Sequence, residues 1–336
     1  MMKKATITSL AALMLSSAGA FAQDTSASAF TTPAGYVTHT LEAGQFNLLG
    51  LTLHESVVVA GSFESVSGTA LGDNDVDFTT ILTSGTTYVL EITNSVNDDN
   101  IGKVQEVVSW TTNEITTSDD LGLQVGDEYQ IRASATISSV FGEDNSSGLQ
   151  GATSSAAADN IYVRVDGGFD VYYFSTGGFF GEGWRRVGGG ATDFSNQPLF
   201  ITDAIYIQRN GATDLDLILT GSVKTGDSQL AVTEDFSFLS GVFPVGSTFE
   251  SSGMQASVVG GSSSGASDNV LIQVEGGGFD TYYYSTGGFF GIGWRKVGDG
   301  STDHSTTELP SAFILSRVGT EDFNLKLDAP ESYDDL

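Results

Sequence analysis

The histidines of this chain are too few and too scattered for the chemistry that histidine usually performs. Only His39, His54 and His304 occur in 336 residues, and no His-x-x-x-His pair joins any two of them. A zinc site needs clustered ligands, and a serine–histidine–aspartate triad needs a histidine beside its nucleophile. Cysteine is absent, which excludes disulfides, thiolate nucleophiles and thiolate metal sites. We therefore expect no catalytic residues and a protein that is not an enzyme.

Carboxylates are the other groups that could do chemistry. Asp73, Asp75 and Asp77 alternate as ligands do early in a calcium loop, which suggests Ca²⁺ and no other cofactor. No glycine and no closing acid follow at the EF-hand positions, so an ordinary solvated turn is the alternative. A carboxylate pair could serve a glycoside hydrolase. With 42 acidic residues some pair will always be close, so the pattern is uninformative.

A block rich in aromatic and basic residues occurs twice. Residues 169–193 and 279–303 are identical at 19 of 25 positions, and both contain the motif Tyr-Tyr…Gly-Gly-Phe-Phe-Gly…Gly-Trp-Arg. Aromatic faces can stack on sugar rings, so these residues are candidate ligand contacts, with packing in the core as the alternative. The candidates are Tyr172, Phe179, Phe180, Trp184 and Arg185, and in the second copy Tyr282, Phe289, Phe290, Trp294 and Arg295.

Two phenylalanines stand in the middle of each glycine-rich turn, where turn tips are normally polar. Either the tip folds back so that its rings pack into a core, or it is exposed and docks on a partner, a glycan or a lipid surface. The basic residues of the block have the same two interpretations. They could pair with local carboxylates such as Asp170 and Asp280, or they could bind a ligand.

The elements that must position these residues are β-strands. Runs of five to eight residues rich in Val, Ile, Thr, Tyr and Phe alternate with Gly, Ser, Asp and Asn clusters, and no apolar period of 3.6 is present after the N-terminus. We expect an all-β fold of two duplicated antiparallel modules, sandwich- or barrel-like, without significant helix. Residues 169–174, 184–187 and 204–209 are expected to form a three-stranded meander.

The chain divides into four predicted parts. Lys3 and Lys4, a short apolar run and Ala20-Phe21-Ala22 indicate a signal peptide over residues 1–22. A first module is expected over 23–220 with an extra strand-rich segment at about 78–125. A second module is expected over 221–330, followed by an acidic tail over 331–336.

The charge and hydropathy exclude several partners. The formal net charge is −29, which disfavours nucleic acids and anionic lipid surfaces, because both require a basic footprint. No later stretch is long and apolar enough for a membrane helix. We expect an exported protein of the periplasm, the outer cell surface or the medium.

Several motifs together carry a family resemblance. They are Gly-Tyr-Val-Thr at 35–38, Phe-Asn-Leu-Leu at 46–49, Tyr-Val-Leu-Glu-Ile-Thr at 88–93, Ile-Thr-Thr-Ser-Asp-Asp-Leu at 115–121 and the repeated aromatic block. In this combination the chain resembles a paralogous family of secreted proteins found mainly in the Verrucomicrobia. The resemblance implies export and assigns no activity or catalytic residue.

Three hypotheses for function follow. The first is an exported, non-enzymatic structural or interaction protein of the cell envelope or surface, whose partners are envelope components, glycans or other copies of itself. The alternative is a secreted carbohydrate-binding protein that uses the Tyr and Trp faces of the repeated block. The third, a glycan-active hydrolase, has only the number of acids in its favour.

Overall fold

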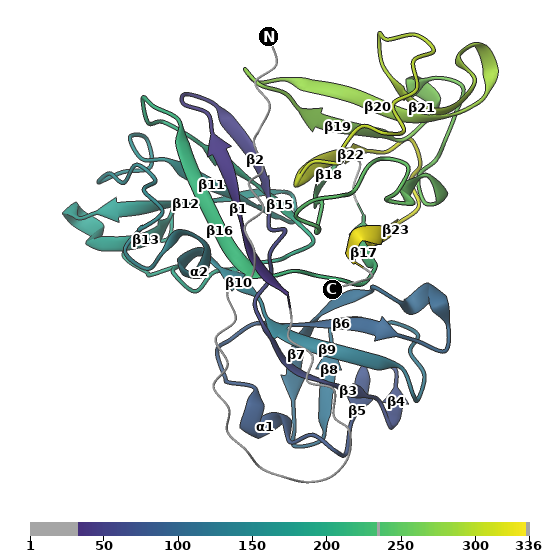
Figure 1. Cartoon of the computed structure of the whole chain (residues 1–336). Helices are drawn as coiled ribbons and strands as arrows, with labels where there is room; N and C mark the ends of the chain where they lie inside the picture. The colour runs from purple at the N-terminus through teal and green to yellow at the C-terminus, as the bar shows by residue number, and fades with distance from the viewer. Residues whose placement is uncertain (1–32, 234–235, 334–336) are drawn as a thin grey trace. The chain divides into compact units, whose positions relative to one another are not determined.

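The computed structural model describes residues 33–233 and 236–333 (Figure 1). The predicted signal peptide and its cleavage site lie outside these ranges. The described residues form an all-β fold of antiparallel sheets, which confirms the predicted fold class. The only α-helices among them are α1 (Phe78–Ile81) and α2 (Ile137–Phe141), of four and five residues. No helix in the described part of the chain is long and apolar enough to cross a bilayer.

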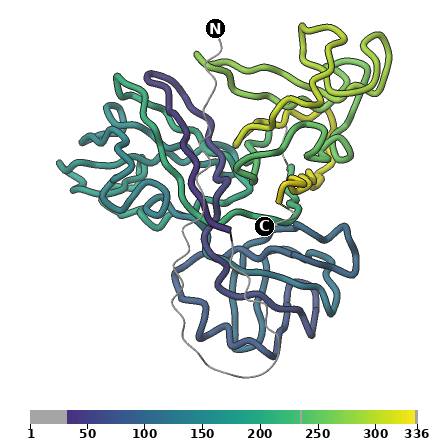
Figure 2. The backbone as a smooth tube through the Cα atoms, in the orientation of Figure 1, coloured from purple at the N-terminus to yellow at the C-terminus, as the bar shows by residue number. Residues whose placement is uncertain are grey.

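The first module combines a five-stranded sheet with two strand pairs. The five-stranded sheet has the order β13 (Glu182–Arg186), β12 (Gly168–Thr176), β11 (Asn160–Val165), β15 (Ala204–Gln208) and β2 (Phe46–Gly50). Beside it lie the pairs β1 (Ala34–Leu41) with β16 (Leu215–Ser222), and β10 (Ala135–Thr136) with β14 (Pro198–Leu199). In Figure 2 the purple β1 can be followed along the green β16.

The second module has a five-stranded sheet with the equivalent strand order. The order is β21 (Ile292–Lys296), β20 (Phe279–Thr286), β19 (Asn269–Gln273), β22 (Ala312–Ser316) and β18 (Phe236–Ser240). A separate pair, β17 (Ser228–Val232) with β23 (Phe323–Leu327), corresponds to β1 with β16. The aromatic block occupies the edge strand and its neighbour in both modules, so each copy has the same place in its sheet.

A seven-stranded sheet lies between β2 and β10 in the sequence. It comprises β3 (Val57–Ser62), β9 (Glu128–Ala133), β6 (Tyr88–Asn94), β7 (Val104–Trp110), β8 (Glu114–Thr117), β5 (Ala70–Gly72) and β4 (Ser65–Ser67), in that order. The extra segment therefore extends beyond the predicted 78–125 at both ends. The strands β4 and β5 have three residues each, which is too short for an alternation of apolar and polar residues to be recognised in the sequence.

Each of the three larger sheets covers a hydrophobic core, and the strand pairs contribute side chains to the cores of the two modules. Strands such as β16 alternate buried and accessible side chains, which is the period of a half-buried strand. The three cores gather around Trp184 in the first module, Trp294 in the second and Tyr129 in the seven-stranded sheet. Burial of large apolar side chains is the main stabilising contribution in such sheets.

Two finer predictions were wrong. The expected meander does not form, because β15 pairs with β11 and β2 rather than with β13. The predicted acidic tail over 331–336 is wrong for Tyr333, which is buried. Its hydroxyl donates to the Val245 carbonyl at 3.0 Å, and its ring contacts Phe243 in the second core.

Candidate interaction site

In both modules the loop between the edge strand and its neighbour, β12–β13 and β20–β21, places phenylalanines at its tip. Gly178–Phe180 and Gly288–Phe290 each form one 3-10 turn. Phe179 is 95 % exposed and Phe289 is 94 % exposed, while the ring of the following phenylalanine lies edge-on at 5.3 Å in both tips. Phe179 and Phe289 are therefore exposed and not packed into a core. We call residues 177–182 and 287–292 the first and second tip.

A buried arginine fixes each tip. The Arg185 side chain donates from Nε to the Phe180 carbonyl at 3.1 Å, from Nη1 to the Trp184 carbonyl at 3.0 Å and from Nη2 to the Glu182 carbonyl at 2.6 Å. Arg295 makes the same contacts in the second module at 3.0, 3.0 and 2.8 Å. Because these donors serve backbone carbonyls, the predicted role of Arg185 and Arg295 as ligand contacts was wrong. They position the tips instead.

Glycine is required beside each arginine. Gly183 has a φ of +124° and Gly293 a φ of +129°, which residues with a Cβ rarely adopt. A Cβ on Gly183 would also lie 3.1 Å from Nη1 of Arg185. The Gly-Trp-Arg motif therefore combines a backbone turn, a core anchor and a clamp for the tip.

The predicted sugar-stacking faces are not accessible. Trp184 and Trp294 are each 1 % exposed, and Tyr172 and Tyr282 are buried with them. Trp184 donates from Nε1 to the Gly142 carbonyl at 2.9 Å, and Trp294 stacks on Phe249 at 4.4 Å. These four side chains are core residues, so the prediction that they contact a ligand was wrong.

The second basic residue of each motif pairs locally, as one interpretation expected. Arg186 lies 2.8 Å from Asp170, and Lys296 lies 2.6 Å from Asp280. Burial and then the charge of Asp170 raise the pKa of Tyr172 to about 12, so its hydroxyl stays protonated. Beneath the tips these ion pairs are made within the block, so Arg186 and Lys296 serve its structure.

The three aspartates of the calcium hypothesis serve the local fold. Asp73 accepts from the Tyr129 hydroxyl at 2.7 Å and from the Asp75 amide at 2.9 Å, and Asp77 caps α1 through the Thr79 amide at 3.0 Å. Burial and Asp73 raise the pKa of Tyr129. Within 33–233 and 236–333 no three metal-ligating side chains gather in a suitable cluster. The geometry gives the calcium hypothesis no support.

Sequence reasoning missed a groove lined by aromatic rings. Phe46, Tyr162 and Tyr206 lie on the face of the first five-stranded sheet that points away from its core, with ring centroids of Phe46 5.4 and 5.9 Å from the two tyrosines. Phe169 and Phe279 complete a groove of about 560 Å³. We call it the aromatic groove. Tyr162 and Tyr206 directly oppose each other on β11 and β15. The sequence shows a tyrosine within each strand pattern, but the register that brings them together is known only from the structure.

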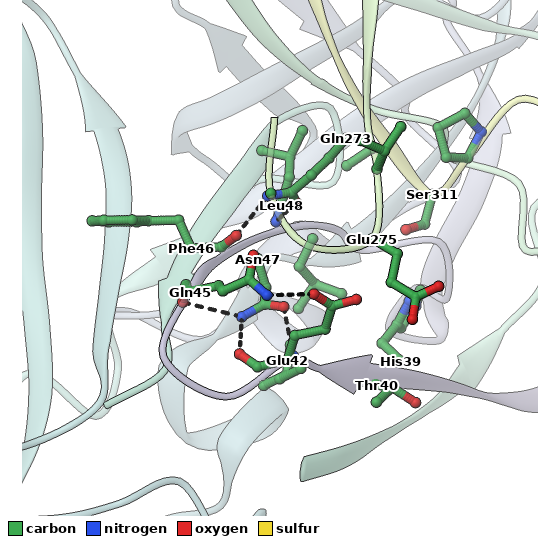
Figure 3. A pocket seen from close by; sticks show the side chains of 16 residues that line it. His39, Thr40, Glu42, Gln45, Phe46, Asn47, Leu48, Gln273, Glu275 and Ser311 are labelled. Carbon is green, nitrogen blue, oxygen red and sulfur yellow. Dashed lines mark hydrogen bonds between the residues drawn. The ribbon is translucent and has the colours of Figure 1, made fainter. Parts of the chain in front are cut away.

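A smaller polar pocket of about 190 Å³ adjoins this groove (Figure 3). Glu42 accepts from the Gln45 amide group at 2.6 Å and from the Gly276 backbone at 3.0 Å, so its carboxylate holds two loops. Burial lowers the pKa of His39 to about 4, which keeps this lining residue neutral at pH 7. The pocket is therefore a place where hydrogen bonds to Glu42 connect the loop after β1 to the loop between β19 and β20.

No family model, no curated protein and no solved structure matches this chain.

Proposed function

We propose that this chain is an exported, non-enzymatic interaction protein of the cell envelope or surface, which binds an envelope component through its two apolar tips. The observation that carries the proposal is the near-complete exposure of Phe179 and Phe289 on tips fixed by buried arginines. Exposed large apolar groups at fixed positions are typical of contact sites.

The energetics favour rigid tips for this purpose. A phenylalanine that becomes buried removes about 150–250 Å² from water, equivalent to several kcal/mol at about 25 cal/mol per Å². Because Arg185 and Arg295 already hold the loops, binding does not have to order them, and less of that gain is lost to conformational entropy. Two tips on one chain add the benefit of bivalent attachment.

The signal-peptide pattern supports export, and the acidic surface supports solubility rather than attachment to anionic lipid. The carbohydrate-binding alternative loses its main support, because the Trp and Tyr faces on which it depended are buried.

Fractionation of native cells tests the proposal. We expect the wild-type chain in the envelope fraction and a Phe179→Ser/Phe289→Ser double variant in the periplasm or medium. Val96→Ser is the matched control, since Val96 is 69 % exposed on a different segment and should leave the protein in the envelope. Retention of a folded double variant at the wild-type level would contradict the proposal.

A further inference from the structure

The aromatic groove offers ring faces and few free polar groups. Gln273 donates to the Phe46 carbonyl at 2.5 Å and accepts from the Leu48 amide at 2.6 Å, so both ends of its side-chain amide are occupied. The Tyr162 hydroxyl donates to Gln208 at 2.8 Å. Sugar sites add several unoccupied hydrogen-bonding groups to their aromatic platforms. The groove is therefore suited to an apolar occupant.

Charged groups lie beside the groove but do not line it, since the Arg164 guanidinium lies over the Phe169 ring at 5.4 Å, and Glu42 and Glu275 line the adjoining pocket. None of the described residues that line it is acidic or basic. Phe46 is 45 % exposed and Phe279 37 %, so an incoming ring can reach the aromatic surface. The volume of about 560 Å³ falls within the range of about 300–1,000 Å³ that is usual for small-molecule sites, and it accommodates a phenylalanine side chain.

The second tip is the apolar group on the same molecule that fits this groove. It reads Gly-Gly-Phe-Phe-Gly-Ile and carries no charge, whereas the first tip has Glu182 where the second has Ile292. Ile292 is 68 % exposed and Phe289 is 94 % exposed, so the second tip presents two apolar side chains to the solvent. Two copies of a chain with a net charge of −29 repel each other, and close contact is favoured where both surfaces lack carboxylates.

We propose that the second tip of one copy docks in the aromatic groove of a second copy, so that the protein assembles with itself. This inference rests on the proposed function and names its partner as another copy of the chain. Tip and groove are different surfaces, so the contact is head-to-tail, and each bound copy keeps a free tip or a free groove. Such contacts propagate into chains unless the geometry closes a ring.

Sedimentation velocity of the purified exported chain tests the inference. We expect wild-type protein to form species larger than a dimer as its concentration rises, and more so at 0.5 M NaCl, where the repulsion between acidic copies is screened. Phe289→Ser removes the tip and Phe46→Ser weakens the groove. Both are surface positions, and circular dichroism checks that each variant is folded. Each variant alone should remain monomeric, and Phe179→Ser should assemble like the wild type.

Mixing the two variants gives the decisive result. Phe289→Ser retains an intact groove and Phe46→Ser retains an intact tip, so an equimolar mixture should form dimers and nothing larger. A mixture that stays monomeric, or a Phe289→Ser variant that still assembles, would overturn the inference. A further result would also overturn the inference. If the wild type is a monomer that is retained on a neutral polysaccharide, and Phe46→Ser abolishes this retention, the groove binds a glycan. A monomeric wild type that still needs its tips for envelope retention would overturn only the self-assembly and leave the proposed function intact.

Discussion

At the scale of single residues, the exposure of the tips depends on arginines that are themselves buried. Arg185 and Arg295 each place three donors on backbone carbonyls of the loop that leads to the tip. A buried guanidinium that gives three of its five N–H donors to backbone carbonyls is a structural group, since only two donors remain for other partners.

Arg185→Met should therefore loosen the first tip. Three carbonyls lose a charged donor, and we expect the free energy of unfolding to fall by about 2–4 kcal/mol. Urea unfolding measures the loss, and hydrogen exchange of residues 178–183 should accelerate. Arg186→Met is the matched control, because Arg186 is accessible and its pairing with Asp170 should contribute little. If Arg185→Met and Arg186→Met have equal stability and equal hydrogen-exchange rates, Arg185 does not hold the first tip.

His54 gives the fold a dependence on pH. Burial, and then the charge of Arg132, lower its pKa from 6.5 to about 3, so the folded protein holds the neutral ring. The unfolded chain takes up a proton as the pH falls through 6.5, and the folded chain does so only near 3. Stability is therefore lost from about pH 6.5 downward and is fully present above it.

The expected size of this effect follows from the pKa difference. Between pH 7 and pH 5 the wild type should lose about 2 kcal/mol more stability than His54→Gln, at about 1.4 kcal/mol per pH unit below 6.5. Asp203, whose pKa burial raises to about 6, acts in the opposite direction, since its contribution is lost as the pH rises from about 4 to 6. That contribution is common to both proteins and cancels in the comparison. If the free energies of unfolding of the wild type and His54→Gln change with pH in parallel, His54 is not the source of this pH dependence.

At the scale of elements, the sequence predicted what is local and missed what depends on long-range contacts. Period-two alternation located β16, because the side chains of a half-buried strand alternate between core and solvent, and a run of β-forming residues located the fully buried start of β6. The exposure of Phe179 could not be predicted, since it depends on carbonyls that Arg185 finds only in the folded loop. The aromatic groove depends on the register of β2 against β15, which joins residues about 160 positions apart.

The seven-stranded sheet should fold by itself. Its first strand, β3, pairs with its last, β9, so the two ends of the segment meet at Val57 and Arg132. It also has a separate core around Phe78, Leu90 and Tyr129. A chain of residues 56–134 should therefore show β-sheet circular dichroism and one cooperative thermal transition. A disordered spectrum would show that the segment depends on the modules.

At the scale of the whole molecule, a buried ionic cluster joins the seven-stranded sheet to the segment that follows β16. Lys224 forms an ion pair with Glu91 on β6, and Arg132 on β9 lies 3.4 Å from the same carboxylate. All three side chains are buried. Removing Lys224 leaves the Oε1 atom of Glu91 without its donor in a medium of low dielectric constant, although Arg132 still balances the charge of the carboxylate.

Lys224→Met should lower the free energy of unfolding by about 2–3 kcal/mol, measured by urea unfolding at pH 6, below the pKa of about 7 to which burial lowers the Lys224 ammonium. Lys326→Met is the matched control, because Lys326 is 45 % exposed and its pair with Asp227 spans 3.5 Å. The control should stay within about 1 kcal/mol of the wild type. A Lys224→Met variant as stable as the control would show that the cluster does not hold these parts together.

The most direct test of the central claim is photocrosslinking in living cells from p-benzoylphenylalanine placed at Phe179, at Phe289 and, as control, at Val96. Contact through the tips predicts crosslinked products from positions 179 and 289 and none from 96, with self-crosslinks from 289 if copies dock on one another. Absence of products from both tips in a folded, exported protein, or equal products from all three positions, would contradict the claim that the tips are the contact sites.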